Sequence, residues 1–414
     1  MNSEFKENMS KQPVLNVGML GSVSDGKSTC VRVLTGIKTQ RHSSEKTRNI
    51  TIKPGYANMK VWSDGNTFHS TSSKPKSYKK DDTDFDLVHH LSFVDCPGHH
   101  ELILTMLGSI KLMNAVIVVV SAAEPIDKKP QLIQHLAAVK LSGIKNIIVC
   151  MNKLDLIDKK TATKRYSELD ILLKRFDIVP KSIIPTSFSK EIGADWLLEE
   201  IMTHFITEDD DISPATFMAT RSFDINKSGN SWEKMTGGVL GGSLFNGNLS
   251  VGDNLEIRPG IIDARNCKCI PIKTKVLSFQ TDQEKLNKIR PGGLIGIGTD
   301  IDPYYCKDDY LSGNIIGLEG TLPSVYNMVE LKYKLTDDFG GNWKPKANDI
   351  MHLQIGALTI ESKVTKFNKK TINFQLSKPA CVGDTSMIII CHKEEGAMKI
   401  VGTGSIKSGT KLID

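Results

Sequence analysis

The sequence lacks any long apolar run, which excludes most membrane-spanning architectures. The longest continuous apolar run, AVIVVVSAA at residues 115–123, falls far short of the roughly 20 residues that a membrane-spanning helix needs. Residues 1–13, MNSEFKENMSKQP, are polar and have no apolar core of the kind that a signal peptide requires. We therefore expect a soluble, cytoplasmic protein.

Cysteine is sparse, and its spacing does not suit a metal site. The chain has eight cysteines and no C-x-x-C pair; Cys267 and Cys269 form an isolated C-x-C. Cys96 and Cys150 lie in apolar runs, where a buried free thiol is the usual finding. We expect a reducing compartment, no disulfide framework and no zinc site.

Neither sign of charge dominates the chain. Its 53 Lys and Arg residues against 47 Asp and Glu give a net charge of +6. This mildly favours an acidic partner such as nucleic acid, but it is far from a basic tail. With 414 residues, of which 39% are hydrophobic, the chain can build two or three domains.

The texture of the sequence changes along the chain. Residues 14–209 alternate apolar β-branched runs with helical stretches, which predicts an α/β domain whose mostly parallel sheet is covered on both faces. Within them, residues 63–86 are nearly free of apolar side chains and predict an exposed, mobile insertion. Glycine-punctuated β-prone runs then predict two β-barrels, domain II at 210–325 and domain III at 326–414. Residues 1–13 are expected to be a flexible N-terminus.

The stretch GSVSDGKS, residues 21–28, has the spacing of a phosphate-binding loop, and we call it the P-loop. It follows an apolar strand-like run and precedes a possible helix, so its backbone N–H groups can wrap phosphates at a helix N-terminus. Lys27 is expected at the β- and γ-phosphates and Ser28 at Mg²⁺. The alternative is a Gly/Ser-rich turn that binds nothing. The candidate nucleotide-binding residues here are Ser24, Asp25, Gly26, Lys27, Ser28 and Thr29.

Two further motifs narrow the nucleotide to GTP with Mg²⁺. In LSFVDCPGHH, residues 91–100, Asp95 can hold Mg²⁺ through water and the Gly98 N–H can sense the γ-phosphate. In IIVCMNKLD, residues 147–155, an apolar strand ends in Asn152, Lys153 and Asp155. The Asp155 carboxylate can accept hydrogen bonds from both N1–H and the 2-amino group of guanine, a pair that adenine does not offer. A surface helix start with Asp as its cap is the alternative.

Three elements carry weaker signals. Ser187 and Phe188 could present backbone N–H groups to the guanine carbonyl, although a Ser-rich turn is the more common explanation for such a stretch. Thr51 could complete Mg²⁺ coordination when the γ-phosphate is present, as a switch residue does. His99 could orient the attacking water, or could simply be solvated.

These strings resemble the translational GTPases, and within them the gamma-subunit family of translation initiation factor 2. The resemblance runs from about residue 14 to 412 and includes RNITIKPGYAN (48–58), the run from VDCPGHH to AVIVVVSA (94–122), GGVLGGSLFNGNLSVGDNLEIRPGI (237–261) and IGALTIESKV (355–364). It implies a GTP hydrolase, slow by itself, that carries methionyl-initiator tRNA to the small ribosomal subunit. It also implies alpha and beta partner subunits in a heterotrimer, activating and nucleotide-exchange factors, and a place for His99 near the hydrolytic water.

The chain departs from the family pattern at several positions. The family loop reads G-H-V-x-H-G-K-[ST], whereas Ser22 and Asp25 replace both histidines here. Asp25 adds negative charge and should weaken phosphate binding unless its carboxylate turns outward. Phe188 stands where alanine follows the serine, and Leu132 where threonine follows glutamine. Residues 63–86 contain no cysteine, which excludes the zinc knuckle that archaeal relatives carry in this insertion.

Two other functions stay open at this point. A metabolic relative of the translational GTPases, such as a sulfate-activation subunit, would ignore aminoacyl-tRNA. A GTP-binding scaffold with little hydrolysis is suggested by the departures at Asp25 and Phe188. Dependence on tRNA separates the first alternative, and phosphate release in a single turnover separates the second.

Overall fold

The computed structural model describes most of the chain. The described residues are 3–39, 54–99, 102–126, 129–205, 213–226, 236–263, 268–282, 284–335, 343–356, 358–383, 386–394 and 396–413. The chain forms two compact units, residues 1–208 with 394–399, and residues 209–393 with 400–414.

The first unit contains a mixed α/β domain. Its helices are α1 (Ser3–Lys11), α2 (Lys27–Thr35), α4 (Ile103–Ile110), α5 (Pro130–Ser142), α6 (Lys159–Arg175) and α7 (Ala194–His204). Its strands are β1 (Leu15–Leu20), β2 (Gly55–Ser63), β3 (Phe68–Ser72), β4 (Tyr78–Lys80), β5 (Thr83–Asp95), β6 (Ala115–Ser121), β7 (Asn146–Asn152) and β8 (Ser182–Pro185).

The strand order of this sheet places β1 next to the point where the strand order reverses, with earlier connections on one side of β1 and later ones on the other. The order is β3-β2-β5-β1-β6-β7-β8, and β4 pairs with β5. Strands β5, β1, β6, β7 and β8 run parallel, whereas β2 and β3 are antiparallel to their neighbours. The chain leaves β1 towards β5 and later returns to its other side through β6. In such sheets, ligands bind beyond the carboxyl ends of the strands at this point.

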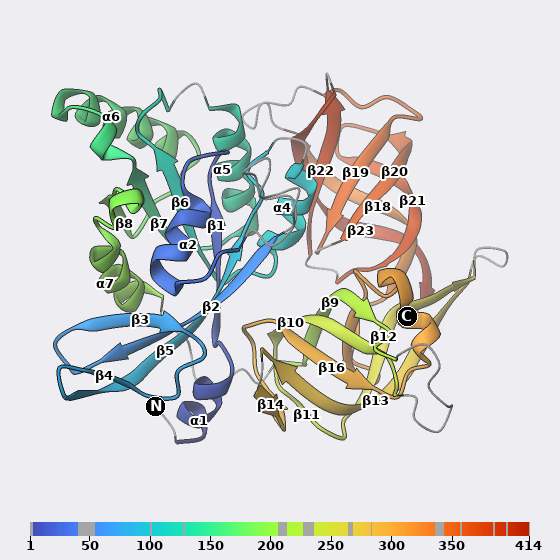
Figure 1. The fold of residues 1–414 in the computed structure, drawn as a ribbon. Coiled ribbons are helices and arrows are strands. Elements are labelled where there is room, and N and C mark those ends of the chain that lie inside the picture. The colour runs from blue at the N-terminus through green and yellow to red at the C-terminus, as the bar shows by residue number, and fades with distance from the viewer. Residues whose placement is uncertain are drawn as a thin grey trace. The chain divides into compact units, whose positions relative to one another are not determined.

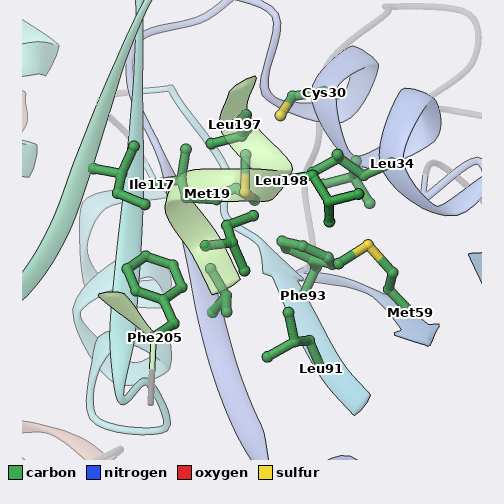
Figure 2. Close-up of a cluster of buried hydrophobic side chains, with 14 of the residues drawn as sticks. Met19, Cys30, Leu34, Met59, Leu91, Phe93, Ile117, Leu197, Leu198 and Phe205 are labelled. Atoms are coloured by element: carbon green, nitrogen blue, oxygen red, sulfur yellow. The ribbon is translucent and has the colours of Figure 1, made fainter. Parts of the chain in front are cut away.

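The central parallel strand β6 is almost entirely apolar because both faces of the sheet are covered there. Every residue of β6 is buried, as expected for a parallel strand that lies between helices. On one face, Ile117 shares a core with Leu34 of α2 and Leu197 of α7 (Figure 2). Val118, which alternates with Ile117, is also buried, and α4 and α5 lie on the other side of the sheet (Figure 1).

The N-terminal segment differs from the flexible tail that its polarity predicts. Residues 3–11 form α1, and Phe5 and Met9, four residues apart, lie on one buried face with Val14. The Met9 carbonyl bonds to Nδ1 of His90 at 2.8 Å, which joins α1 to β5. The prediction for 1–13 therefore fails for α1, because two apolar residues at helical spacing suffice to anchor it.

The insertion at 63–86 also differs from the mobile segment expected. It contains β3, which pairs with β2 at the edge of the sheet, and β4, which pairs with the start of β5 (lower left of Figure 1). Its few aromatic residues gather: Tyr78 lies 5.4 Å from Phe85 and 6.2 Å from Trp62 between ring centroids, and His69 lies 5.1 Å from Phe85. Large rings bury much apolar area per residue, so a composition poor in apolar residues still orders these strands.

The second unit contains two closed β-barrels. The strands of the first region are β9 (Thr216–Phe223), β10 (Val239–Asn246), β11 (Leu249–Ser250), β12 (Asn254–Asp263), β13 (Lys268–Thr281), β14 (Glu284–Leu286), β15 (Lys288–Ile289), β16 (Ile295–Thr299) and β17 (Ile315–Leu318). Those of the second are β18 (Val325–Leu335), β19 (Ile350–Ile355), β20 (Leu358–Phe367), β21 (Thr371–Cys381), β22 (Met387–Glu394) and β23 (Ala397–Ile413).

Six described strands close each barrel, as the glycine-punctuated texture predicts. The first barrel has the order β12-β17-β9-β10-β16-β13 and is closed by pairing of β12 with β13. The second has the order β18-β21-β20-β19-β22-β23 and is closed by pairing of β23 with β18. The chain is thus a mixed-sheet α/β domain followed by two β-barrels. In the described part of the chain, no helix has the length and apolar character needed to cross a membrane.

Candidate nucleotide-binding site

A pocket of about 510 Å³ opens beside the P-loop, in the size range of small-molecule sites. The P-loop follows β1, the segment 95–98 begins at the last residue of β5, and the segment 152–155 begins at the last residue of β7, so all three lie at the carboxyl edge of the sheet. The lining residues are Val23, Ser24, Gly26, Lys27, Ser28, Thr29, Gly98, His99, Asn152, Lys153, Asp155, Leu156 and Ser189.

Most of the residues predicted from sequence meet at this pocket. Those that line it are Ser24, Gly26, Lys27, Ser28, Thr29, Gly98, His99, Asn152, Lys153 and Asp155. Asp25, Asp95, Ser187 and Phe188 do not line it but hydrogen-bond to neighbouring groups of the site. Thr51 lies outside the described residues. Val23, Leu156 and Ser189 were not predicted; each lies within two residues of a predicted position, which is the only sequence signal for them.

Asn152 ties the P-loop to the loop of residues 187–189. Its Nδ2 donates to the Asp25 carbonyl at 2.8 Å, and its Oδ1 accepts from the Phe188 N–H at 3.0 Å. Gly26 has φ 106° and a Cβ there would lie 2.3 Å from Asn152 Nδ2, so the contact requires glycine. Asn152 therefore fixes the P-loop backbone at Asp25 relative to the loop of residues 187–189.

Lys27 is held inside the P-loop. Its Nζ donates to the carbonyls of Gly21 at 2.9 Å and Ser22 at 2.8 Å. Burial lowers the pKa of Lys27, and the Asp95 and Asp25 carboxylates oppose that shift. Both carbonyl partners are neutral, so anionic phosphate oxygens would be stronger acceptors for this ammonium. The Ser22 hydroxyl is buried and makes no hydrogen bond to the described residues, leaving a second polar group beside the phosphate site.

The oxygen atoms near Ser28 suit Mg²⁺. Ser28 Oγ donates to Asp95 Oδ2 at 2.6 Å, and Thr39 Oγ1 donates to the same oxygen at 2.6 Å. Hydroxyl and carboxylate oxygens are the ligands that Mg²⁺ prefers, so these residues fit the ion that the P-loop implies. Thr39 was missed because a lone threonine after a helix carries no motif.

Gly98 lies against the P-loop. A Cβ on Gly98 would lie 2.7 Å from Lys27 Nζ and 2.8 Å from the Val23 nitrogen. Any other residue would have to displace the P-loop backbone or the lysine. The close approach places the Gly98 N–H and the neighbouring His99 at the phosphate end of the pocket.

Asp155 lines the pocket and is held by two neighbouring side chains. The Ser187 hydroxyl donates to Asp155 Oδ1 at 2.6 Å, and Lys190 Nζ lies 3.5 Å from Oδ2. The Ser187 hydrogen bond, with a smaller effect of Lys190, lowers the pKa of Asp155. An ionised carboxylate is the form that accepts two donors from guanine. Ser187 thus contacts Asp155 through its side chain, a contact that sequence reasoning did not foresee.

Phe188 belongs to the core of the domain. Its ring is 1% exposed and packs in the cluster that also contains residues of α2 and α7. Its backbone N–H bonds to Asn152, as described above, and the residue does not line the pocket. The substitution of phenylalanine for the family's alanine is accommodated by burial of the ring away from the nucleotide site.

His135 of α5 supports the first residue of the P-loop. Its Nδ1 accepts a hydrogen bond from the Gly21 N–H at 3.0 Å, so Nδ1 carries no proton. Burial, reinforced by the charge of Lys27, lowers the pKa of His135 to about 3. The imidazole therefore acts as a fixed acceptor at physiological pH.

This pKa predicts a pH-dependent stability. Between pH 6.5 and about 3 the unfolded state binds a proton at residue 135 that the folded state does not, so stability falls as pH falls. We expect wild type to lose about 2 kcal/mol of unfolding free energy between pH 8 and pH 5 through this residue, and His135→Gln, which keeps an acceptor, to lose that much less. Urea titrations at both pH values measure the difference. Equal pH dependence in the two proteins would contradict it, and His204→Gln at the surface of α7 is the matched control.

Comparison with known proteins shows the family of the chain. Residues 12–207 match the family model described as "Elongation factor Tu GTP binding domain", and residues 328–406 match "Initiation factor eIF2 gamma, C terminal". Two solved structures share the fold. A bacterial selenocysteine-specific elongation factor EF-Sec has TM-score 0.72 and 22% identity over 95% of this chain, which spans only 58% of that longer chain. The elongation factor SelB from Methanococcus maripaludis, in complex with the GTP analogue GppNHp, has TM-score 0.70 and 21% identity over 97% of this chain and 80% of its own.

Curated relatives are similar over nearly the whole chain. "Eukaryotic translation initiation factor 2 subunit gamma" of Encephalitozoon cuniculi is 37% identical, over 98% of this chain and 95% of the relative. "Translation initiation factor 2 subunit gamma" of Pyrococcus furiosus is 36% identical, over 96% and 98%. "Eukaryotic translation initiation factor 2 subunit 3" of Drosophila melanogaster is 34% identical, over 98% and 91%. The chain therefore belongs to the gamma-subunit family of translation initiation factor 2 and is a translational GTPase of initiation.

Proposed function

We propose that this chain is a GTP-dependent carrier of methionyl-initiator tRNA, which it delivers to the small ribosomal subunit, with GTP hydrolysis as the release step. The observation that carries the proposal is the convergence of the P-loop, Gly98 and Asp155 on one pocket. Family membership supports the initiation role. We further propose the domain limits 14–209, 210–325 and 326–414, and a cytoplasmic location.

Each end of the pocket has a proposed task in nucleotide binding. At the base end, Asp155 accepts hydrogen bonds from guanine, and Ser187 holds that carboxylate in place. At the phosphate end, Lys27 moves its hydrogen bonds from backbone carbonyls to phosphate oxygens. Mg²⁺ held by Ser28, by Asp95 through water and by Thr51 would neutralise phosphate charge when bound.

Hydrolysis needs a water molecule aligned with the γ-phosphate. His99 lines the pocket next to Gly98 and is proposed to orient that water. Attack of the water oxygen on the γ-phosphorus breaks its bond to the β-phosphate oxygen, and GDP and phosphate leave. Loss of the γ-phosphate removes the contacts at Gly98 and Thr51, which releases the tRNA-binding state. We expect slow hydrolysis without an activating protein and the ribosome.

The proposed partners follow from the multisubunit initiation factor to which the family belongs. They are the alpha and beta subunits in a heterotrimer, a GTPase-activating protein and a nucleotide-exchange factor. The net charge of +6 is compatible with a nucleic-acid ligand.

Filter binding tests the proposed cargo. Methionyl-initiator tRNA and elongator methionyl-tRNA are each titrated with the protein in GTP and in GDP. We expect the affinity for initiator tRNA to be about 5- to 150-fold higher with GTP than with GDP, the usual range of coupling between linked sites. This affinity should fall steeply as the salt concentration rises. Binding of neither tRNA would support a metabolic relative instead, and equal binding of the two would contradict the proposed selection of initiator tRNA.

A single-turnover assay tests the enzymatic part. Phosphate release from bound GTP is followed with small ribosomal subunits, the partner subunits and activating protein present. Release above the rate of the protein alone supports hydrolysis as the timing step, and its absence with His99 intact would leave a GTP-binding scaffold.

A further inference from the structure

The P-loop contains a buried ion pair that its motif does not require. Asp25 Oδ1 lies 2.6 Å from Lys129 Nζ, and the side chains are 2% and 7% exposed. Asp25 Oδ2 accepts the Ser22 N–H at 2.8 Å, and Lys129 also donates to the Ser121 carbonyl at 3.2 Å. The exposed carboxylate of Glu124 lies 3.9 Å from the same ammonium. Both charges of the pair therefore have fixed partners.

Lys129 comes from a part of the chain far from the P-loop. It is the residue before α5, and His135 on the first turns of that helix supports Gly21. Asn152 holds the Asp25 carbonyl from a third direction. The position and the charge of residue 25 are thus set by contacts across the domain.

The sign of the charge decides what this arrangement does. A carboxylate inside a loop that binds phosphates repels them, and at low local dielectric the repulsion is large. The Asp25 carboxylate does not line the pocket and faces Lys129 instead. Removing the ammonium would leave an uncompensated buried negative charge next to the phosphate site. Because the two charges cancel, the pair adds no net charge beside the P-loop, and in this respect it is equivalent to a neutral side chain at position 25.

We propose that Lys129 is a positioning residue for nucleotide binding: by neutralising Asp25 and holding its carboxylate away from the pocket, it keeps the P-loop receptive to phosphates. The proposal rests on the guanine-nucleotide binding proposed above. It answers how a loop with aspartate at position 25 can take phosphates, and it adds a residue outside every recognised motif to the site.

Three variants test the proposal through the direction of their effects. Lys129→Met should weaken GDP and GTP binding by about tenfold or more, because the negative charge of Asp25 remains. Asp25→Asn keeps an acceptor oxygen for the Ser22 N–H and should strengthen nucleotide binding or leave it unchanged. The double variant should return close to wild type. Dissociation constants come from titration with fluorescent GDP and competition by GTP.

The readout separates charge from simple structural support. If the pair were only a brace, both single variants would weaken binding, the double variant would stay weak, and the proposal would be overturned. Lys129→Arg should retain wild-type affinity, and Lys140→Met, at an exposed lysine of α5 paired with Asp177, is the control. Thermal unfolding checks that each variant is folded. If Lys129→Met does not fold, the proposal is still supported when the double variant binds nucleotide with nearly wild-type affinity and Asp25→Asn does not bind more weakly than wild type. A double variant with weak nucleotide binding rejects the proposal. Failure of wild type to bind GDP or GTP would instead reject the proposed function.

Discussion

Lys27→Ala is expected to abolish GTP-dependent binding of initiator tRNA, even at millimolar GTP. The ammonium is buried in the P-loop, and its two carbonyl partners come from Gly21 and Ser22. Charge-assisted hydrogen bonds to phosphate contribute about 1.5–3 kcal/mol each, so loss of two of them lowers nucleotide affinity by roughly two to four orders of magnitude. Without the γ-phosphate held in place, the GTP state is not formed.

Filter binding with labelled initiator tRNA and direct GTP titration measure this effect. Lys164→Ala, at an exposed position of α6, is the matched control and should behave as wild type. The thermal unfolding midpoint of the Lys27→Ala variant should lie within a few degrees of the wild-type midpoint, which shows that the variant is folded. Undiminished tRNA binding at saturating GTP would show that Lys27 does not have the proposed role.

Asp155→Asn is expected to change the preferred base from guanine to xanthine. The carboxylate is proposed to accept two hydrogen bonds from guanine, and asparagine replaces one acceptor oxygen by an NH₂ donor. That donor meets the 2-carbonyl of xanthine, whereas with guanine it faces another donor. The loss of two charge-assisted bonds predicts a fall in GTP affinity of about 10²- to 10⁴-fold, with a gain for xanthosine triphosphate.

The structure offers a close control for this substitution. Asp158, three residues further on, accepts the Thr161 N–H at 2.7 Å as the N-cap of α6 and does not line the pocket. Asp158→Asn keeps a capping side chain and should leave base preference unchanged. Competition between GTP and xanthosine triphosphate measures both variants. Unchanged GTP affinity in Asp155→Asn would refute the role of this carboxylate in base recognition.

The sequence alone determined the class of fold and the family, and it named most of the residues that line the pocket at the carboxyl edge of the sheet. Local patterns carry these features: continuous apolar runs identify buried parallel strands, glycine-punctuated runs identify barrels, and the spacing within residues 21–28 and 152–155 reflects phosphate and guanine chemistry. Because the carboxyl ends of neighbouring parallel strands meet at one edge, motifs that end separate strands lie together in the structure.

Some local features escaped sequence reasoning because few residues carry them. The helix α1 depends on Phe5 and Met9 within a polar segment. The strands of the insertion depend on a small group of aromatic rings that includes Tyr78 and Phe85. Average composition over a window hides such anchors, since the free energy comes from a few large buried side chains.

Only the tertiary structure showed that the aspartate of the P-loop, Asp25, is paired with Lys129 and turned away from the pocket. Asp25 and Lys129 are 104 positions apart, and Gly21 and His135 are 114 apart. A lysine before a helix and a histidine within it have no distinctive pattern in sequence. The packing of α5 against the loop after β1 brings them together, and burial then gives their charge or neutrality its large effect on the site.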